Sequence, residues 1–548
     1  MTTDWLIRFF PPVTDASGRF SMRLSLHHAL YFMLLVLLVC AQSVSNYMMS
    51  ALEILLAVNW ALEWDMRRKF ARGNWHPLLV AFLVLALVHL VWLIPSENIA
   101  YGLQDLFGKL PLLAIPLIVL TSRPLTRPQL SLAMACFVFT VFVATLIGHV
   151  RQATMPQLAY RDIIPFISHI RFALNVCLAM IFLAAFLLVH ARRHGRLQAA
   201  VAVPVGLLMV YFVHFLLLIH SYTALIILFV VALVMLLAYG RHIENRRWQH
   251  LLVTLFLTAL VAAVIVVAVC VRDYYKLVPL ARQPLATATV NGNPYQHKQN
   301  GFVENGNLVE NYVCDVELAR EWAKRSELPL ATVTSNGYAV YPTLLRYLNA
   351  LGTTKDSVGM QLLTDEDVRA IEQGIANPVY LHGSKLRVML YVMLYEYESY
   401  RVFGAVKNFS VLQRLELWRN TWQVFLHSPL FGCGTGDIGD CCQTELTRRH
   451  SPLADHPRNP HNQYLTSLAT FGLVGTALIV LAFVWALRRI RWWRRPLLVA
   501  YLVVVLISFI SENTLSTLAG CVFSTTFFCL LSHPPNPEDF DESAERQT

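Results

Sequence analysis

The sequence predicts an all-helical polytopic membrane protein of about twelve transmembrane helices, with one large hydrophilic loop between the ninth and tenth. Three observations lead to this fold class. Apolar residues make up 56% of the chain and charged residues only 14%, whereas a soluble domain carries about 25% charged residues. Apolar runs long enough to cross about 30 Å of hydrocarbon recur along the chain. Most Arg and Lys residues outside the loop lie in short segments between these runs, which is typical of membrane topology and not of nucleic-acid binding.

The apolar runs define the expected spans. Residues 1–28 are mixed and polar and show no cleavable signal sequence, so we expect them to form a cytoplasmic N-terminus. The first two spans are separated by almost nothing, and Glu53 lies inside the second, so a single re-entrant hairpin is an alternative to two full spans. The expected spans are 29–45, 47–63, 78–95, 109–122, 130–148, 166–190, 199–219, 223–240, 250–272, 465–486, 497–511 and 515–532.

The basic residues predict the orientation, because they fall in alternate connections and mark the cytoplasmic side. The short connections on the other side hold only Lys109, Arg151 and Arg161. We therefore expect both termini in the cytoplasm. The basic residues of the cytoplasmic side are Arg8, Arg19, Arg23, Arg67, Arg68, Lys69, Arg72, Arg123, Arg127, Arg192, Arg193, Arg196, Arg241, Arg246, Arg247, Arg488, Arg489, Arg491, Arg494 and Arg495. The expected divisions after the N-terminus are helices 1–9 in 29–272, a periplasmic loop in 273–460, helices 10–12 in 461–532 and a cytoplasmic tail in 533–548.

The large loop differs sharply in composition from the spans. It contains a turn cluster at residues 291–294 and a helical segment at 315–325. Residues 364–367 open a polar helix that should end near Gly374. These patterns predict a small, mostly helical cap. On the outer side of a membrane a disulfide is allowed, and Cys433 could pair with either of two cysteines, Cys441 or Cys442.

The strongest candidate site lies where the loop runs into the tenth span. Asn459 is a good N-cap and Pro460 is favoured at the first helical position. His461, Asn462 and Gln463 are then expected in the first turn, where backbone N–H groups without partners make an anion site. A reactive His461 and an interfacial His461 that merely caps the helix are equally good interpretations.

Helical spacing links His461 to the interior of the span. Gly472 follows eleven residues later and should lie on the same helix face, about 16 Å deeper. Gly475 is close to that face, and glycines on one face allow close helix packing. We therefore expect His461 to face the packed side of the bundle, at its outer mouth.

Three charged residues are further candidates. Arg171 lies about one turn into the sixth span, where a charge indicates function unless the side chain snorkels to the headgroups. Glu512, at the outer end of the eleventh span, has the same two interpretations. Arg414 lies in the first turn of a loop helix, where a cation opposes the helix dipole and favours a nearby anion, although an exposed Arg on a polar face is more common.

The glycine-rich segment Gly432–Gly436 has the look of a phosphate loop. No strand precedes it and no Lys follows it, so a tight turn is the better interpretation.

These motifs resemble the O-antigen ligase and polymerase superfamily. His461-Asn462, a gap of nine residues and Gly472-Leu473-Val474-Gly475 are similar to its His-Asn/Ser/Gln and Gly-x-x-Gly pattern. Segments 414–418 and 429–434 resemble its Arg-x-x-x-Trp and Pro-Leu-x-Gly-x-Gly motifs, and Glu512-Asn513-Thr514-Leu515 also looks like the family. Segments 317–326 and 346–348 resemble a ligase branch with a long loop.

The resemblance implies transfer of a glycan from undecaprenyl diphosphate at the periplasmic face of the bacterial inner membrane, without nucleotide, metal or cofactor. Lipid A–core is the acceptor of the ligases, a growing glycan that of the polymerases, and a protein hydroxyl that of the O-oligosaccharyltransferases. His461 would be the base or would orient the acceptor, and Arg171 and Arg414 would hold the diphosphate. A single displacement would invert the anomeric configuration. Membrane lipids, and no nucleic acid, are the other expected partners.

One family arginine has no counterpart. The family often carries it in Ser-Arg-Thr or Thr-Arg-Gly at the outer end of the seventh or eighth span, where this chain has Tyr222. Either Arg171 or a loop arginine then replaces it, or the diphosphate is contacted in a different way. The residues expected to bind substrate are Asn462, Gln463, Tyr464, Arg458, Arg387, Arg401, Glu512 and Tyr222.

Two alternatives to the ligase remain open. A polymerase or an O-oligosaccharyltransferase of the same superfamily would share these motifs, although the ligase-like loop argues mildly against a polymerase. A transporter or flippase would predict internal repeats and charges near the bilayer midplane, whereas the intramembrane charges here cluster at the outer ends of the spans. An O-antigen ligase is therefore the expected function.

Overall fold

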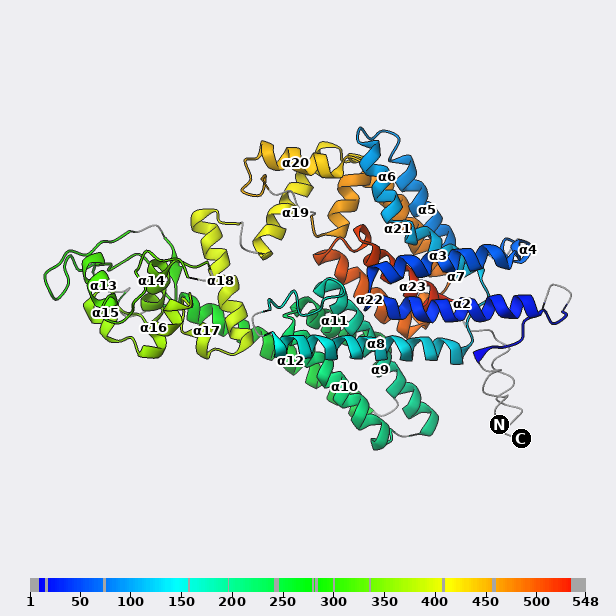
Figure 1. The fold of residues 1–548 in the computed structure, drawn as a ribbon, viewed down its shortest axis with the longest axis horizontal. Coiled ribbons are helices and arrows are strands. Elements are labelled where there is room, and N and C mark those ends of the chain that lie inside the picture. Colours follow the sequence, from blue (N-terminus) through cyan, green and yellow to red (C-terminus); the bar gives the residue numbers. More distant parts are fainter. Residues whose placement is uncertain are drawn as a thin grey trace. The chain divides into compact units, whose positions relative to one another are not determined.

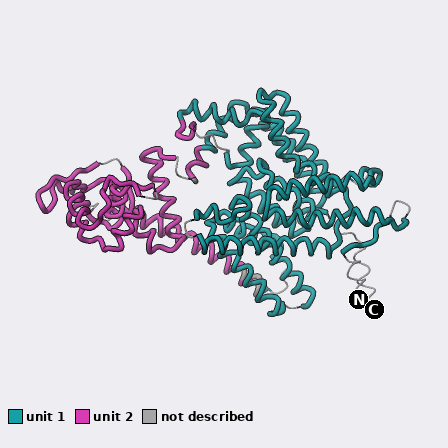
Figure 2. Tube along the Cα trace, in the orientation of Figure 1, with its two compact units in different colours: residues 1–249, 417–450, 456–548 teal, residues 250–416, 451–455 magenta. Residues whose placement is uncertain are grey.

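The computed structural model divides the chain into two compact units (Figure 2). Unit 1 comprises Met1–Gln249, Leu417–His450 and His456–Thr548, and unit 2 comprises His250–Glu416 and Ser451–Asp455. Each unit is described by itself. The residues that the structure describes are 9–14, 18–71, 75–155, 158–195, 197–240, 246–277, 280, 284–298, 301–334, 337–406, 410–455 and 460–533.

Unit 1 is built from helices (Figure 1). Two further helices, α12 (Arg246–Tyr275) and α19 (Ser410–His427), begin in one unit and end in the other. The helices of unit 1 are α2 (Met22–Ala41), α3 (Asn46–Glu63), α4 (Met66–Lys69), α5 (Pro77–Val91), α6 (Ile99–Gly108), α7 (Pro111–Thr121), α8 (Arg127–Thr154), α9 (His169–His194), α10 (Ala199–Leu218), α11 (Tyr222–Tyr239), α20 (Ile438–Arg448), α21 (Gln463–Arg489), η3 (Trp492–Arg494), α22 (Pro496–Ser511), η4 (Thr514–Ser516) and α23 (Leu518–Ser532).

The apolar helices confirm a helical, multi-pass membrane protein, but not the count of twelve spans. Within the described residues, eight helical segments are long and apolar enough to cross a membrane. Helices α5, α22 and α23 are apolar but shorter, and α3, with Glu53 inside it, is not among the eight. The eight segments are Met22–Ala41, Ile99–Thr121, Arg127–Thr154, His169–His194, Ala199–Leu218, Tyr222–Tyr239, Val253–Tyr275 and Gln463–Arg489.

The centre of unit 1 is formed by α9 and α23. Residues 172–183 of α9 are all buried, because other helices surround this stretch on every side. Phe137 of α8, Phe182 of α9 and Phe527 of α23 meet with ring centroids 4.9–5.9 Å apart. The start of α9 and the turn before α23 are therefore anchored to a well-packed core.

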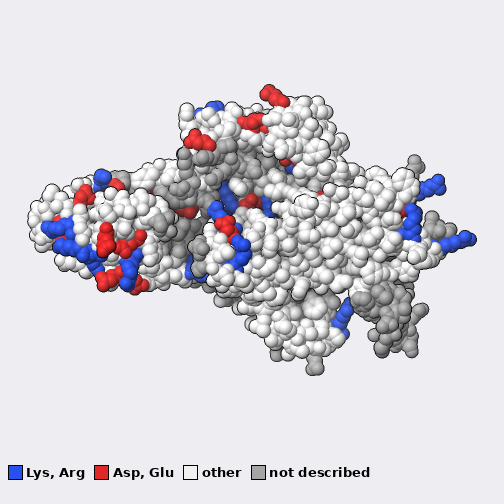
Figure 3. All heavy atoms as spheres, viewed as in Figure 1, with Lys and Arg blue, Asp and Glu red and all other residues white. Residues whose placement is uncertain are grey.

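Unit 2 has a hydrophobic core of its own, centred on Trp322, Leu344, Tyr347 and Ile371. The polar helix expected from residues 364–367 is α16, and in the structure Thr364 forms a capping box with Asp367. The face seen in Figure 3 carries many charges on unit 2 and large uncharged areas on unit 1. The elements of unit 2 are β1 (Val303–Glu304), β2 (Asn307–Leu308), α13 (Asp315–Trp322), α14 (Val340–Ala350), α15 (Ser357–Gln361), α16 (Asp365–Glu372), α17 (Val379–His382) and α18 (Lys385–Phe403).

The two short strands of unit 2 form a β-hairpin. Strand β1 pairs antiparallel with β2, so that Val303 faces Leu308 and Glu304 faces Asn307. Asn305 and Gly306 make the two-residue turn with φ of 51° and 73°. Asn-Gly is favoured in such turns because both central residues need positive φ.

A buried carboxylate ties three segments of unit 2 together. Oε1 of Glu317 accepts hydrogen bonds from the Thr289 hydroxyl at 2.6 Å and from the Asn293 amide at 2.8 Å. Oε2 accepts the Ser357 N–H at 3.0 Å. Burial raises the pKa of Glu317, but the hydrogen bonds lower it by a larger amount. The net result is a pKa lowered from 4.5 to about 2. The ionised carboxylate therefore stabilises the fold of unit 2.

Replacing Glu317 with Gln should destabilise unit 2 by about 1–3 kcal/mol at neutral pH. The amide nitrogen of Gln is itself a donor, so at least one of the three groups that donate to Glu317 would lose its acceptor. The wild-type contribution is fully present above pH 4.5, the ordinary pKa, and is lost as the pH falls through about 2. Hydrogen exchange of peptides covering residues 289–320 in both proteins measures the difference. If hydrogen exchange differs between wild type and Glu317→Gln by the same amount at pH 3 and pH 7, the effect does not come from the charge of the carboxylate.

Candidate functional site

The helix that was expected to begin at Asn459 begins later in the structure. The N-cap is Asn462, whose side chain accepts the Leu465 N–H at 3.0 Å, and α21 starts at Gln463. The prediction that Pro460 and His461 form the first turn is therefore wrong, and Asn459 lies outside the described residues. The physical reason is local: His461 has φ of +52°, which a right-handed helix cannot contain.

His461 lies against a buried carboxylate. Its Nδ1 is 3.3 Å from Oε2 of Glu512. The His461 side chain is 37% exposed and that of Glu512 only 10%, so the carboxylate is shielded while the ring reaches solvent. A carboxylate at Nδ1 favours the tautomer with a proton on that nitrogen. Nε2 of His461 is then left to take up a proton.

Asn513, next to Glu512, connects the two parts of the site. Its side-chain oxygen accepts the backbone N–H of Asn462 at 2.7 Å and the hydroxyl of Thr466 at 3.1 Å. Its backbone carbonyl accepts a hydrogen bond from Nη2 of Arg171 at 3.1 Å. The structure thus brings together His461, Glu512 and Arg171, which are far apart in the sequence. In the sequence, Asn513 stands out only as part of Glu512-Asn513-Thr514-Leu515, and no role was predicted for its side chain.

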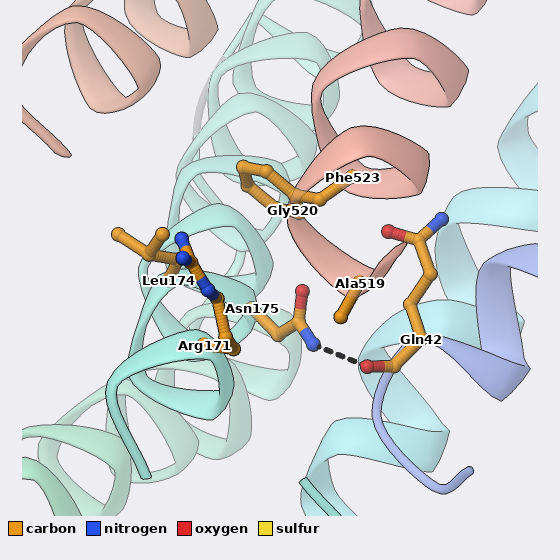
Figure 4. Close-up of a pocket in the computed structure, with 7 residues that line it drawn as sticks. All are labelled: Gln42, Arg171, Leu174, Asn175, Ala519, Gly520 and Phe523. Carbon is orange, nitrogen blue, oxygen red and sulfur yellow. Dashed lines mark hydrogen bonds between the residues drawn. The ribbon is translucent and has the colours of Figure 1, made fainter. Parts of the chain in front are cut away.

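The two terminal nitrogens of the Arg171 guanidinium differ in their contacts. Its Nη1 is buried and has no hydrogen-bond partner among the described residues. It lines a small cavity together with Gln42 and Asn175, and Figure 4 shows the Asn175 amide donating to the Gln42 carbonyl, at 2.8 Å. The cavity volume is about 10 Å³, which is room for about one water molecule. The side-chain amide of Gln42 also has no partner within the described part of the chain.

Helix α21 is interrupted at Gly472. This residue has φ of 62° and ψ of −167°, outside the helical region. The expected continuous helix that puts Gly472 on the face of His461 is therefore wrong. The cause is a segment from elsewhere in the chain: the N–H groups of Leu473 and Val474 donate to the carbonyls of Pro429 at 2.8 Å and Leu430 at 3.0 Å.

Residues 432–436, which follow Pro429 and Leu430 in the chain, form a tight turn against α21. Cys433 and Gly434 donate their N–H groups to the carbonyls of Ala469 and Thr470, at 2.9 and 3.0 Å. The remaining N–H groups between residues 432 and 436 also have protein acceptors, which are the Ser428 carbonyl, the Trp92 carbonyl and the Ser96 hydroxyl. These donors are not free for a phosphate, in agreement with the tight-turn interpretation.

Residues 375–480 match a family model described as O-Antigen ligase. The chain carries a domain of the O-antigen ligase superfamily. The match confirms the resemblance seen in the sequence. No curated protein matches the chain.

The O-antigen ligase domain supplies only part of the site. His461 and Gly472 lie inside the matched residues, whereas Arg171, Glu512 and Asn513 lie outside them. Glu512, the carboxylate partner of His461, and Arg171, which donates to the Asn513 carbonyl, therefore come from segments of unit 1 beyond the matched residues.

The other predicted residues near the start of α21 have structural contacts. Oε1 of Gln463 accepts the Leu515 N–H at 3.0 Å, and the Tyr464 hydroxyl donates to the Leu506 carbonyl at 2.9 Å. Both residues hold the O-antigen ligase domain against the last helices. Tyr222 begins α11 and stacks on His220, with ring centroids 6.1 Å apart.

Three of the predicted loop arginines, Arg387, Arg401 and Arg414, belong to unit 2. Arg387 lies 3.8 Å from Asp273, and Arg401 pairs with Glu398 at 2.6 Å. Arg414 lies about one turn into α19, and Arg458 falls outside the described residues. The site in unit 1 is thus defined by His461, Glu512, Asn513 and Arg171.

The ten cysteines are free thiols in the structure. Neither of the disulfides that the sequence allows, from Cys433 to Cys441 or to Cys442, is formed.

Proposed function

We propose that the protein is an inverting glycosyltransferase that moves O-antigen or a related glycan from undecaprenyl diphosphate to lipid A–core. The observation that carries the proposal is the pairing of His461 with the buried Glu512, next to an arginine with a spare donor, in a chain with an O-antigen ligase domain. We place this site at the periplasmic face of the bacterial inner membrane, with both termini in the cytoplasm.

The first chemical step concerns the acceptor. Nε2 of His461 removes the proton of an acceptor hydroxyl as its oxygen bonds to the anomeric carbon. The Glu512 carboxylate stabilises the imidazolium that forms. General base catalysis of this kind is typically worth about 10²–10⁴-fold in rate. The imidazolium later returns its proton to solvent.

The second group of contacts concerns the leaving group. As the bond between the anomeric carbon and the phosphate oxygen breaks, negative charge grows on the undecaprenyl diphosphate. The guanidinium of Arg171 supplies a fixed cation close to Glu512 for this charge, because its Nη2 is held on the Asn513 carbonyl. A preorganised cation stabilises this charge more than a mobile one does. The leaving group is already activated, so transfer needs neither nucleotide nor metal.

A reconstituted assay tests the proposal. The purified protein in lipid vesicles, given undecaprenyl-diphosphate-linked glycan and lipid A–core, should form glycan-linked lipid A–core with inverted anomeric configuration. Gel electrophoresis of the product and NMR of the new linkage check this. Growth of the lipid-linked glycan without attachment to lipid A–core would indicate a polymerase. Movement of the donor across the membrane without any product would indicate a flippase.

A further inference from the structure

Unit 2 contains a cavity of about 120 Å³. The β1–β2 hairpin forms one wall, and the chain after α12 forms another. The hairpin turn sits directly on this chain, since a Cβ on Gly306 would overlap the carbonyl oxygen of Lys276. Leu277, which lines the cavity, is 52% exposed, so the cavity reaches the surface of unit 2.

Two amides in the lining lack partners. Asn307 is 2% exposed and Asn311 is 6% exposed. Nδ2 of Asn307 and Oδ1 of Asn311 have no hydrogen-bond partner among the residues that the structure describes. Buried polar atoms are normally paired, and leaving them unpaired destabilises a fold. A ligand that offers one acceptor and one donor would satisfy both.

The other described lining residues are uncharged and mostly apolar. They include Leu277, Leu285, Val303 and Leu308, with Tyr312 beside them, and none of the described lining residues is Lys, Arg, Asp or Glu. A diphosphate would find no cation among these described residues, and an acyl chain would leave both amides unpaired. The ligand group is therefore neutral and part polar, part apolar.

We propose that this cavity binds the acetamido group of an N-acetylated sugar. Its carbonyl accepts from Asn307, its N–H donates to Asn311, and its methyl group contacts the leucines. Exchange of oxygen and nitrogen in both asparagine side chains reverses the roles and leaves the match intact. The proposal rests on the proposed function for its choice of a glycan, and names a substrate feature that unit 2 recognises.

Sugar binding tests the inference without any transfer reaction. The purified full-length protein in lipid nanodiscs is titrated with N-acetylglucosamine, glucosamine and glucose, and saturation-transfer NMR measures binding. N-acetylglucosamine should bind at least tenfold more tightly than the other two, with the strongest transfer to its acetyl methyl group. Equal binding of the three sugars, or no binding of N-acetylglucosamine, overturns the inference. This comparison needs no variant.

Variants locate the binding. Asn307→Leu and Asn311→Leu keep the side-chain size and remove the amide, so each should weaken N-acetylglucosamine binding at least tenfold. Asn291→Leu, at an exposed position of the same unit, is the matched control and should bind as wild type. Unchanged binding by both cavity variants overturns the assignment to this cavity.

The His461→Ala protein separates the two proposals. It should bind N-acetylglucosamine as wild type does. Transfer by the wild-type protein without sugar binding overturns the cavity inference alone. Sugar binding by a wild-type protein that transfers no lipid-linked glycan overturns the proposed function alone.

Discussion

Replacing His461 with Ala lowers the rate of glycan transfer about 10²–10⁴-fold in the reconstituted assay, because the acceptor hydroxyl loses its base. The protein stays folded, since the His461 side chain is partly exposed and its hydrogen bond within the described residues is the one to Glu512. Initial rates at saturating donor and acceptor measure the effect. A His461→Ala protein that transfers glycan at the wild-type rate excludes His461 as the base.

Two further variants make this result specific. His450→Ala is the matched control, because His450 is exposed and has nearly the same positive φ, 50° against 52°. It should transfer glycan as wild type does. Glu512→Gln removes the charge that stabilises the imidazolium but keeps the size of the side chain. Its rate should fall, and the pH–rate profile should shift, whereas a purely structural role of Glu512 would leave the profile in place.

Replacing Gly472 with Ala should abolish a stable fold of unit 1. The backbone conformation of Gly472 is one that only glycine adopts readily. A Cβ there would also lie 2.3 Å from the carbonyl oxygen of Leu430. Strain of about 1–3 kcal/mol from the backbone alone adds to this overlap. The yield of monodisperse protein in gel filtration and the midpoint of thermal unfolding measure the loss.

Gly439→Ala is the matched control for Gly472. Gly439 lies in α20, where a Cβ would meet nothing within 4 Å. Alanine is also the better helix former, by about 1 kcal/mol. This variant should be as stable as wild type or slightly more stable. A Gly472→Ala protein with the same melting midpoint would contradict the contact between α21 and the segment at Leu430.

The sequence predicts local structure well where one rule decides it. The polar helix opened by residues 364–367 is an example, because its cap residue Thr364 and the partner Asp367 are only three positions apart. The start of α21 was predicted wrongly because Asn459 and Asn462 are equally good caps, and local rules do not choose between them. The break at Gly472 depends on Leu430, a contact that no helical period reveals. Likewise, the number of spans was not confirmed, because hydropathy alone does not separate a short apolar helix from a full span.

The candidate site was predicted residue by residue, but its assembly was not. His461, Arg171 and Glu512 were each recognisable, as a histidine in a motif or as charges at the ends of apolar runs. Their contacts join residues 51 and 342 positions apart, so only the fold reveals them. Asn513 is an uncharged amide between two predicted spans, and no sequence pattern distinguishes its side chain from other amides in such positions.

The interruption of α21 constrains the order in which the chain matures. Residues 429–436 leave the ribosome before α21 does, yet backbone groups of Pro429, Leu430, Cys433 and Gly434 find their partners only on that helix. Equally, the N–H groups of Leu473 and Val474 cannot enter hydrocarbon unpaired. We therefore expect insertion of α21 and closure of the earlier segment to be coupled. In a nascent chain arrested before α21, the segment would have its contacts with Ser428, Trp92 and Ser96 but not those with α21.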